Sequence, residues 1–154
     1  MINPPSTPWL ICQNNHNEYA FALCDVIETM RPLAPHPFAG MPGFVLGVAT
    51  LRGQAVPVVD MTALMGASRT APPGRYVTLR IGARVVAVAV DSVIGLRRLD
   101  PAAQTDLPPL LSEAAAHTVS AIAALDSGLL LVLQSAHLIP QAVWQALETQ
   151  ELAQ

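Results

Sequence analysis

Short apolar runs with a period of two, interrupted every few residues by glycine, proline or asparagine, restrict the architectures open to this chain. Such alternation is typical of β-strands, whereas an amphipathic helix has a period of 3.6. The proline-rich stretch Pro32–Pro42 cannot form a regular helix or a central strand, because proline lacks an amide donor and fixes φ. The pattern predicts an all-β protein with strands at Trp9–Gln13, Tyr19–Leu23, Gly47–Leu51, Ala55–Val59, Tyr76–Ile81 and Arg84–Val90, and a final hairpin from Ser120 to Leu133.

The segments between these runs predict a bend, two short helices and a break. Asp25–Met30 is expected to continue as a strand past a bend, and Met61–Met65 to form a helical turn. The sequence SRTAPPG at Ser68–Gly74 is the expected break between two halves of the chain. From Pro140 onward, good helix formers carry Val143, Leu147 and Leu152 at roughly helical spacing. We therefore expect a C-terminal helical tail at 140–154.

An internal sequence repeat relates the two halves of the chain. A shift of 67 positions lays Ala20–Arg31 on Ala87–Arg98, so that Ile27 meets Ile94. A shift of 74 positions lays Ala49–Met65 on Ala123–Ile139 in the same order. This repeat predicts a duplicated unit, and hence two similar small β-barrels, in which closure removes exposed strand edges.

Composition narrows the function. Hydrophobic residues make up 52% of the 154 residues and charged residues 12%, against roughly 25% charged in an ordinary soluble domain. Some of that apolar surface is expected to contact partners. The net charge is −3 and the basic residues are scattered singly, so nucleic acid is not an expected ligand.

No membrane-spanning or secretory segment is predicted. The longest apolar runs, such as Val85–Val90 and Gly128–Leu133, are far shorter than the roughly 20 residues that cross a bilayer. The N-terminus lacks a basic segment followed by an apolar one, so no signal peptide is visible. We expect a cytoplasmic protein that does not insert into a membrane.

Catalytic and metal-binding motifs are absent from the sequence. The four histidines, His16, His36, His117 and His137, are far apart and have no cysteine or carboxylate at ligand spacing. No nucleophile elbow, P-loop or dinucleotide-binding glycine motif occurs. We expect no enzyme activity, no cofactor and no metal.

The two cysteines flank the first predicted hairpin. A turn centred on His16 would place Cys12 opposite Ala20 and Ile11 opposite Phe21. Cys12 and Cys24 would then not face each other, so we expect two buried, reduced thiols rather than a disulfide.

Four segments in order resemble a CheW-type domain, the coupling protein of bacterial chemosensory arrays. They are YAFALCDVIE at Tyr19–Glu28, LGVATLRGQAVPVVDMTALMG at Leu46–Gly66, LRIGARVVAVAVDSVIGL at Leu79–Leu96 and IAALDSGLLLVL at Ile122–Leu133. The resemblance implies two five-stranded SH3-like β-barrels packed together in one domain at 9–139. Their expected lobes lie at about 20–70 and 75–139, with the N-terminal strand able to cross between them.

The resemblance also implies a role and its partners. Members of this family have no enzymatic activity and act as scaffolds or adaptors. They couple the cytoplasmic tips of transmembrane, methyl-accepting chemoreceptors to the histidine kinase CheA. The regulatory domain of that kinase is a related pair of barrels.

Five residues match positions at which the family meets its partners. Arg52, in the LRG turn, and Gly47, before it, are expected at or near a contact surface. Arginine offers five fixed donors and a flat face to a partner, but Arg52 could instead pair with Asp60 and hold its own loop. Val26 and Glu28 are expected on a receptor-facing groove, with core packing of Val26 as the alternative. Leu96 is a further expected contact, or an ordinary packing residue.

Two alternatives to a chemotaxis adaptor stay open. The chain departs from the family pattern at Ala22, Thr50 and Gln134, which leaves room for an adaptor of a non-flagellar chemosensory pathway, such as one for pili and twitching. From a different class, a double β-barrel could bind a small ligand in the groove between its lobes.

Overall fold

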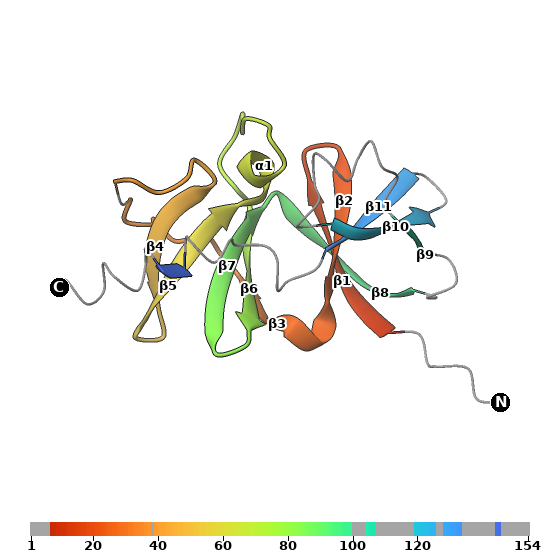
Figure 1. The fold of residues 1–154 in the computed structure, drawn as a ribbon, viewed down its shortest axis with the longest axis horizontal. Helices are drawn as coiled ribbons and strands as arrows, with labels where there is room; N and C mark the ends of the chain where they lie inside the picture. The colour runs from red at the N-terminus through yellow and green to blue at the C-terminus, as the bar shows by residue number, and fades with distance from the viewer. Residues whose placement is uncertain are drawn as a thin grey trace.

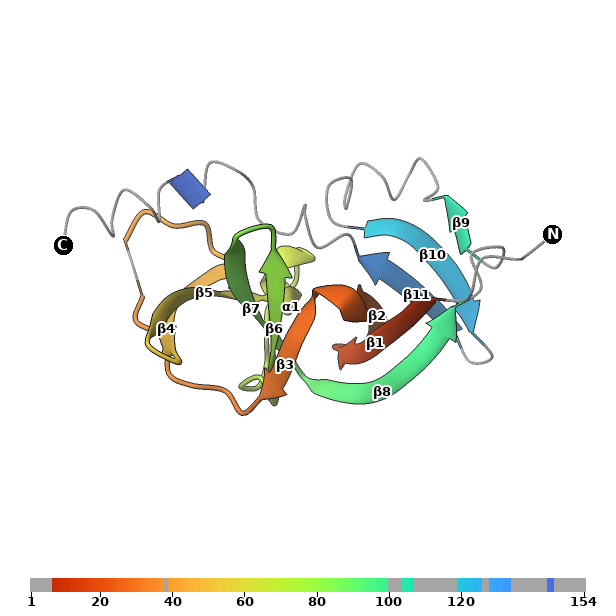
Figure 2. The ribbon, with the colours of Figure 1, turned by 90° about the horizontal axis from the view of Figure 1, so that it is seen from below.

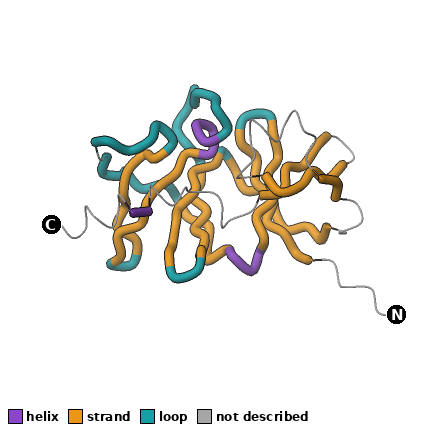
Figure 3. Tube along the Cα trace, viewed as in Figure 1, coloured by secondary structure: helices purple, strands orange, loops and turns teal. Residues whose placement is uncertain are grey.

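Two β-sheets lie side by side in the structure, a computed structural model that describes residues 7–37, 39–99, 104–106, 119–125, 128–133 and 144–145 (Figure 1). Strands dominate the described residues, and helix occurs among them only as short segments (Figure 3). The strands are β1 (Thr7–Asn14), β2 (Asn17–Ala22), β3 (Val26–Met30), β4 (Val45–Leu51), β5 (Gln54–Asp60), β6 (Arg75–Ile81), β7 (Arg84–Val90), β8 (Ser92–Leu99), β9 (Gln104–Asp106), β10 (Val119–Leu125) and β11 (Gly128–Leu133). The helical turns are η1 (Leu23–Asp25) and α1 (Met61–Leu64).

The two sheets repeat one strand order. The first runs β3-β6-β7-β5-β4 and the second runs β8-β1-β2-β11-β10-β9. In each, the third and fourth strands pair in parallel, β7 with β5 and β2 with β11, and the other neighbours are antiparallel. The two SH3-like barrels predicted from the sequence are confirmed, and the second sheet adds the short outer strand β9.

The duplication extends to the irregularities of the strands. A shift of 74 carries β4 onto β10 and moves a register break between Val45 and Gly47 onto one between Val119 and Ala121. A shift of 67 carries Ile27 in β3 onto Ile94 in β8, and both residues lack a paired partner in their ladders. The predicted internal repeat is confirmed, because chance similarity would not reproduce bulges at equivalent positions.

The division of the chain between lobes differs from the prediction. Strands β6 and β7 belong to the first sheet, whereas β1 and β2 belong to the second, so the expected bounds 20–70 and 75–139 are wrong. The first sheet is formed by strands between Val26 and Val90, and the second by strands within 7–22, 92–99, 104–106, 119–125 and 128–133. Figure 2 shows the chain crossing from the second lobe to the first between β2 and β3, and back to the second lobe between β7 and β8. Ser68–Gly74, the expected break, is a loop within the first lobe.

The valines and alanines of β7 alternate between two apolar clusters. Val86, Val88 and Val90 pack in one cluster, and Ala87 and Ala89 in another, so both faces of this strand are buried. We call the first cluster the shared core, because it joins both sheets through Leu10, Cys12, Tyr19, Phe21, Val45, Val59, Met61, Val77, Leu79, Val86, Val88, Val90, Leu133 and Trp144. The lobes therefore bury apolar surface against each other.

The first hairpin differs from the prediction by one residue. Its turn holds two residues, Asn15 and His16, because Asn14 pairs with Asn17. Cys12 therefore lies opposite Tyr19, not Ala20. Both cysteines are free, but only Cys12 is buried, and Cys24 is exposed on η1, where the chain leaves the sheet.

Trp144 and Gln145 have helical backbone, and the remainder of the predicted tail at 140–154 lies outside the described residues. Trp144 is buried in the shared core, and the guanidinium of Arg84 lies 4.9 Å from the centre of its ring. Trp144 therefore packs beside β7 of the first lobe.

Candidate partner-binding surface

The LRG motif forms the two-residue turn between β4 and β5. Leu51 pairs with Gln54, which leaves Arg52 and Gly53 as the central residues, with φ of 50° and 77°. Hairpin turns with positive φ at both positions favour asparagine or glycine, because a Cβ is crowded there. Arg52 therefore occupies a backbone conformation unfavourable to its residue type, a feature that often accompanies a functional side chain.

Arg52 forms a bidentate ion pair with Glu28 of β3. Its Nε and Nη2 donate to the two carboxylate oxygens of Glu28 at 3.1 and 2.7 Å. The alternative pairing with Asp60 is wrong. The hydrogen bond from Arg52 lowers the pKa of the Glu28 carboxyl, and Glu28 raises the pKa of the guanidinium. The Arg52 side chain remains 80% exposed, so its planar face is open to a partner.

Gly47 lies where two backbones approach closely. His36 forms a bridge to Val48 through two hydrogen bonds of 2.9 Å, which covers the outer edge of β4. A Cβ on Gly47 would overlap the carbonyl group of His36, and φ at Gly47 is 143°. The requirement for glycine is therefore explained within the domain, by the approach of the proline-rich loop to β4.

The remaining predicted residues lie on both lobes. Val26 on β3 is half-buried and packs against the shared core. Leu96 on β8 is 60% exposed, so ordinary packing does not describe it. Near them on the same two strands, the unpaired residues Ile27 and Ile94 are 42% and 43% exposed. The structure brings Glu28 and Arg52 into contact, and it adds two equivalent exposed isoleucines that only the shift of 67 could have indicated.

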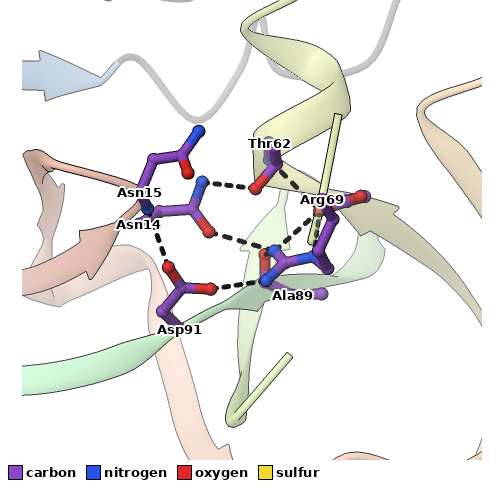
Figure 4. A network of polar contacts seen from close by, with 7 residues as sticks. Asn14, Asn15, Thr62, Arg69, Ala89 and Asp91 are labelled. Atoms are coloured by element: carbon purple, nitrogen blue, oxygen red, sulfur yellow. Dashed lines mark hydrogen bonds and ion pairs between the residues drawn. The ribbon is translucent and has the colours of Figure 1, made fainter. Parts of the chain in front are cut away.

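A polar network at the junction of the lobes was not predicted (Figure 4). Arg69, from the loop between α1 and β6, donates to Asp60 from both Nε and Nη2, at 3.0 and 2.7 Å. It also donates to Asn14 at the end of β1 and to Asp91 between β7 and β8. Sequence analysis missed this network because its members are far apart along the chain.

The described residues contain no group of three or more histidine, cysteine or acidic side chains placed to hold a metal ion. None of the helices in that same part of the chain is long and apolar enough to span a membrane.

Two repeated barrels, strand exchange between lobes and an exposed arginine on the β4–β5 turn define a double-barrel domain built from duplicated halves. The chain belongs to the CheW-like domain family, whose model matches residues 8–143.

Similar proteins agree with this assignment. Over 94 residues the chain is 36% identical to Protein FrzA of Myxococcus xanthus, which covers 60% of this chain and 58% of that protein. Over 69 residues it is 39% identical to the chemotaxis protein CheW of Rhizobium meliloti (strain 1021), and this match covers 44% of this chain and 43% of that protein. The matched region thus spans about half the length of these relatives.

A solved structure shares the fold. The crystal structure of the scaffolding protein TtCheW from Thermoanaerobacter tengcongensis superposes with a TM-score of 0.79 at 19% identity, covering 90% of this chain and 95% of that one.

Proposed function

We propose that this protein is a non-enzymatic adaptor that couples transmembrane chemoreceptors to the histidine kinase CheA in a chemosensory array. The observation that carries the proposal is the geometry of Arg52. It occupies an unfavourable turn conformation, is oriented by Glu28, and keeps 80% of its side chain exposed. Such a side chain is an oriented donor for a carboxylate or carbonyl of another protein.

The proposed partners are the regulatory domain of CheA and the cytoplasmic tip of a methyl-accepting chemoreceptor. Family membership supports both, and the exposed apolar residues on β3 and β8 support protein contacts generally. Ile27, Ile94 and Leu96 expose large side chains on these strands, and apolar side chains among few charges are typical of protein interfaces. The protein would act in the cytoplasm, held at the membrane by its partners.

A second candidate is an adaptor of a non-flagellar pathway. The 36% identity to Protein FrzA favours it. The same surfaces would serve, with a different receptor and kinase. Binding compared between the kinases of the two kinds of pathway in the source organism, at equal concentrations, distinguishes the candidates.

A small-ligand function has less support. A cavity of about 250 Å³ at the lobe junction is lined by Asn15, Thr62, Arg69, Thr70, Ala71, Pro72, Gly74 and Asp91. Its main charged groups, Arg69 and Asp91, already bind each other, so they are not free to recognise a ligand.

The test is titration calorimetry of the purified protein with the regulatory domain of its cognate kinase. We expect micromolar affinity, about −8 kcal/mol, which suits an exchangeable assembly. A pull-down with a receptor cytoplasmic fragment, with and without the kinase domain, tests the bridging step. No heat together with no shift in gel filtration at high concentration would contradict the proposal.

A further inference from the structure

The two lobes associate mainly through apolar contacts. The shared core contains Leu10, Tyr19 and Phe21 from the second sheet and Val77 and Val88 from the first. No strand pair of the described chain crosses from one sheet to the other. Apolar burial is not directional, so it stabilises the association without by itself selecting one orientation of the lobes.

Arg69 supplies directional contacts at the edge of this interface. Its guanidinium lies between the two sheets, close to Asn14 and Asp91 (Figure 4). Asn14 ends β1 in the second sheet, Asp60 ends β5 in the first, and Asp91 occupies the crossing from β7 to β8. One side chain therefore contacts both lobes and the segment that joins them.

Each partner of Arg69 is held by a further bond. Asn14 Nδ2 donates to Thr62 Oγ1 at 2.8 Å, and the Thr62 amide donates to Asp60 Oδ1 at 3.1 Å. The amide of Asn15 donates to the second carboxylate oxygen of Asp91 at 2.7 Å. A displaced lobe would break several of these bonds together, because a polar network tolerates only a narrow range of geometries.

The Arg69–Asp60 pair is largely shielded from water, whereas the side chain of Asp91 is 42% exposed. The side chains of Arg69 and Asp60 are 13% and 8% exposed, and Asn14 is buried. Burial alone would lower the pKa of the Arg69 guanidinium, but its hydrogen bonds to Asp60 and Asp91 outweigh this effect and raise that pKa. A buried ion pair contributes little net stability compared with apolar packing, and its best-attested use is to select one arrangement.

We propose that Arg69 is a positioning residue that fixes the orientation of the two lobes, while the shared core holds them together. The observation behind it is the contact of one guanidinium with Asn14, Asp60 and Asp91. The proposal goes beyond the adaptor function and does not depend on which proteins bind, because its measurement is the distance between lobes.

The experiment measures that distance by pulsed electron spin resonance in the full chain. Spin labels are attached through Ala55→Cys on the first lobe and Arg97→Cys on the second, both exposed positions. Cys24→Ser removes the exposed native thiol, and Cys12 is buried. Melting temperatures are measured on the same labelled proteins.

Three variants separate orientation from stability. Arg69→Met removes the cation and leaves Asp60 and Asp91 uncompensated, so its melting temperature should fall by several degrees. Arg69→Met with Asp60→Asn and Asp91→Asn removes every charge, and asparagine can still cap α1. This charge-free variant should recover most of the lost melting temperature. Arg69→Lys keeps the positive charge but lacks the planar set of guanidinium N–H donors.

The distance distribution decides the outcome. We expect one narrow distribution in the parent protein and in the control Arg80→Met, an exposed arginine on β6. All folded Arg69 variants should show a distribution at least twice as broad, or displaced, including the charge-free one. If Arg69→Met does not fold, the charge-free variant and Arg69→Lys show whether the orientation of the lobes depends on Arg69. A parent-like distribution in the folded variants would overturn the proposal and leave Arg69 a purely stabilising residue.

Discussion

Arg52 and Glu28 are 24 residues apart in sequence, yet two hydrogen bonds join them between the two edge strands of the first sheet. Arg52 directly follows β4 and Glu28 lies on β3, and these strands are the last and the first in the order of the sheet. The pair therefore closes one side of the barrel at its surface. It also fixes the direction in which the guanidinium is presented to other proteins.

Arg52→Ala should leave the domain stable and weaken partner binding. An exposed ion pair contributes little to stability, so the melting temperature should change by no more than about 2 °C. Loss of an anchoring arginine commonly weakens an interface tenfold or more. Thermal melts and calorimetry with the kinase domain measure the two effects, with Arg80→Ala as the matched control. Wild-type affinity in Arg52→Ala would show that Arg52 pairs with Glu28 without contributing to kinase binding.

Arg52→Asn should separate turn stability from binding more sharply. Asparagine adopts positive φ more readily than arginine, and Asn-Gly is a preferred pair for this hairpin turn. We therefore expect a melting temperature equal to or above that of the parent, with binding still reduced at least tenfold. Thermal melts and titration calorimetry test this on one preparation. A clear loss of stability would mean that the ion pair, rather than the backbone, controls the turn.

Gly47→Ala should destabilise the domain by about 2 kcal/mol or more, because the new Cβ would overlap the His36 carbonyl at an already positive φ. Gly43→Ala is the control, because nothing lies within 4 Å of the position that its new Cβ would take. Chemical denaturation measures both. If Gly47→Ala kept parental stability and lost only binding, Gly47 would be a contact residue and the close approach would not explain it.

Glu28 should titrate below its ordinary pKa. Because the folded-state pKa is lowered by Arg52, the pair is intact above the ordinary glutamate value of about 4.3. Its contribution is lost as the pH falls through the lowered pKa. Carbon-detected NMR titration of the Glu28 carboxyl measures the midpoint. In Arg52→Ala the midpoint should rise toward the ordinary value, and an identical midpoint in both proteins would rule out the pairing in solution.

The two thiols should react differently. Burial raises the pKa of Cys12 to about 12, whereas Cys24 is exposed. Alkylation at pH 8 should therefore add one group to the native protein and two in denaturant, as mass spectrometry can show. Cys24→Ser should abolish the native reaction. Rapid double labelling without denaturant would indicate that β1 is not buried as described.

Local patterns in the sequence determined the strands, the duplication and the family. Strand period and turn residues depend on neighbours along the chain, so β4, β5, β6 and β7 were found to within one or two residues. The shift of 67 pairs Ile27 with Ile94, and the structure shows that both residues lack a ladder partner. β8 was missed as a strand, because Gly95 and the exposed pair Arg97 and Arg98 interrupt the alternation.

Contacts between distant segments were decided only by the tertiary structure. The sequence offered Asp60 as a partner for Arg52, but the closed sheet brings Glu28 to that arginine and leaves Asp60 to Arg69. The exchange of β3 and β8 between lobes has no local signal either, because the same strand pattern fits pairing in either sheet. An ion pair depends on where side chains meet in space, and that is set by which strands share a sheet.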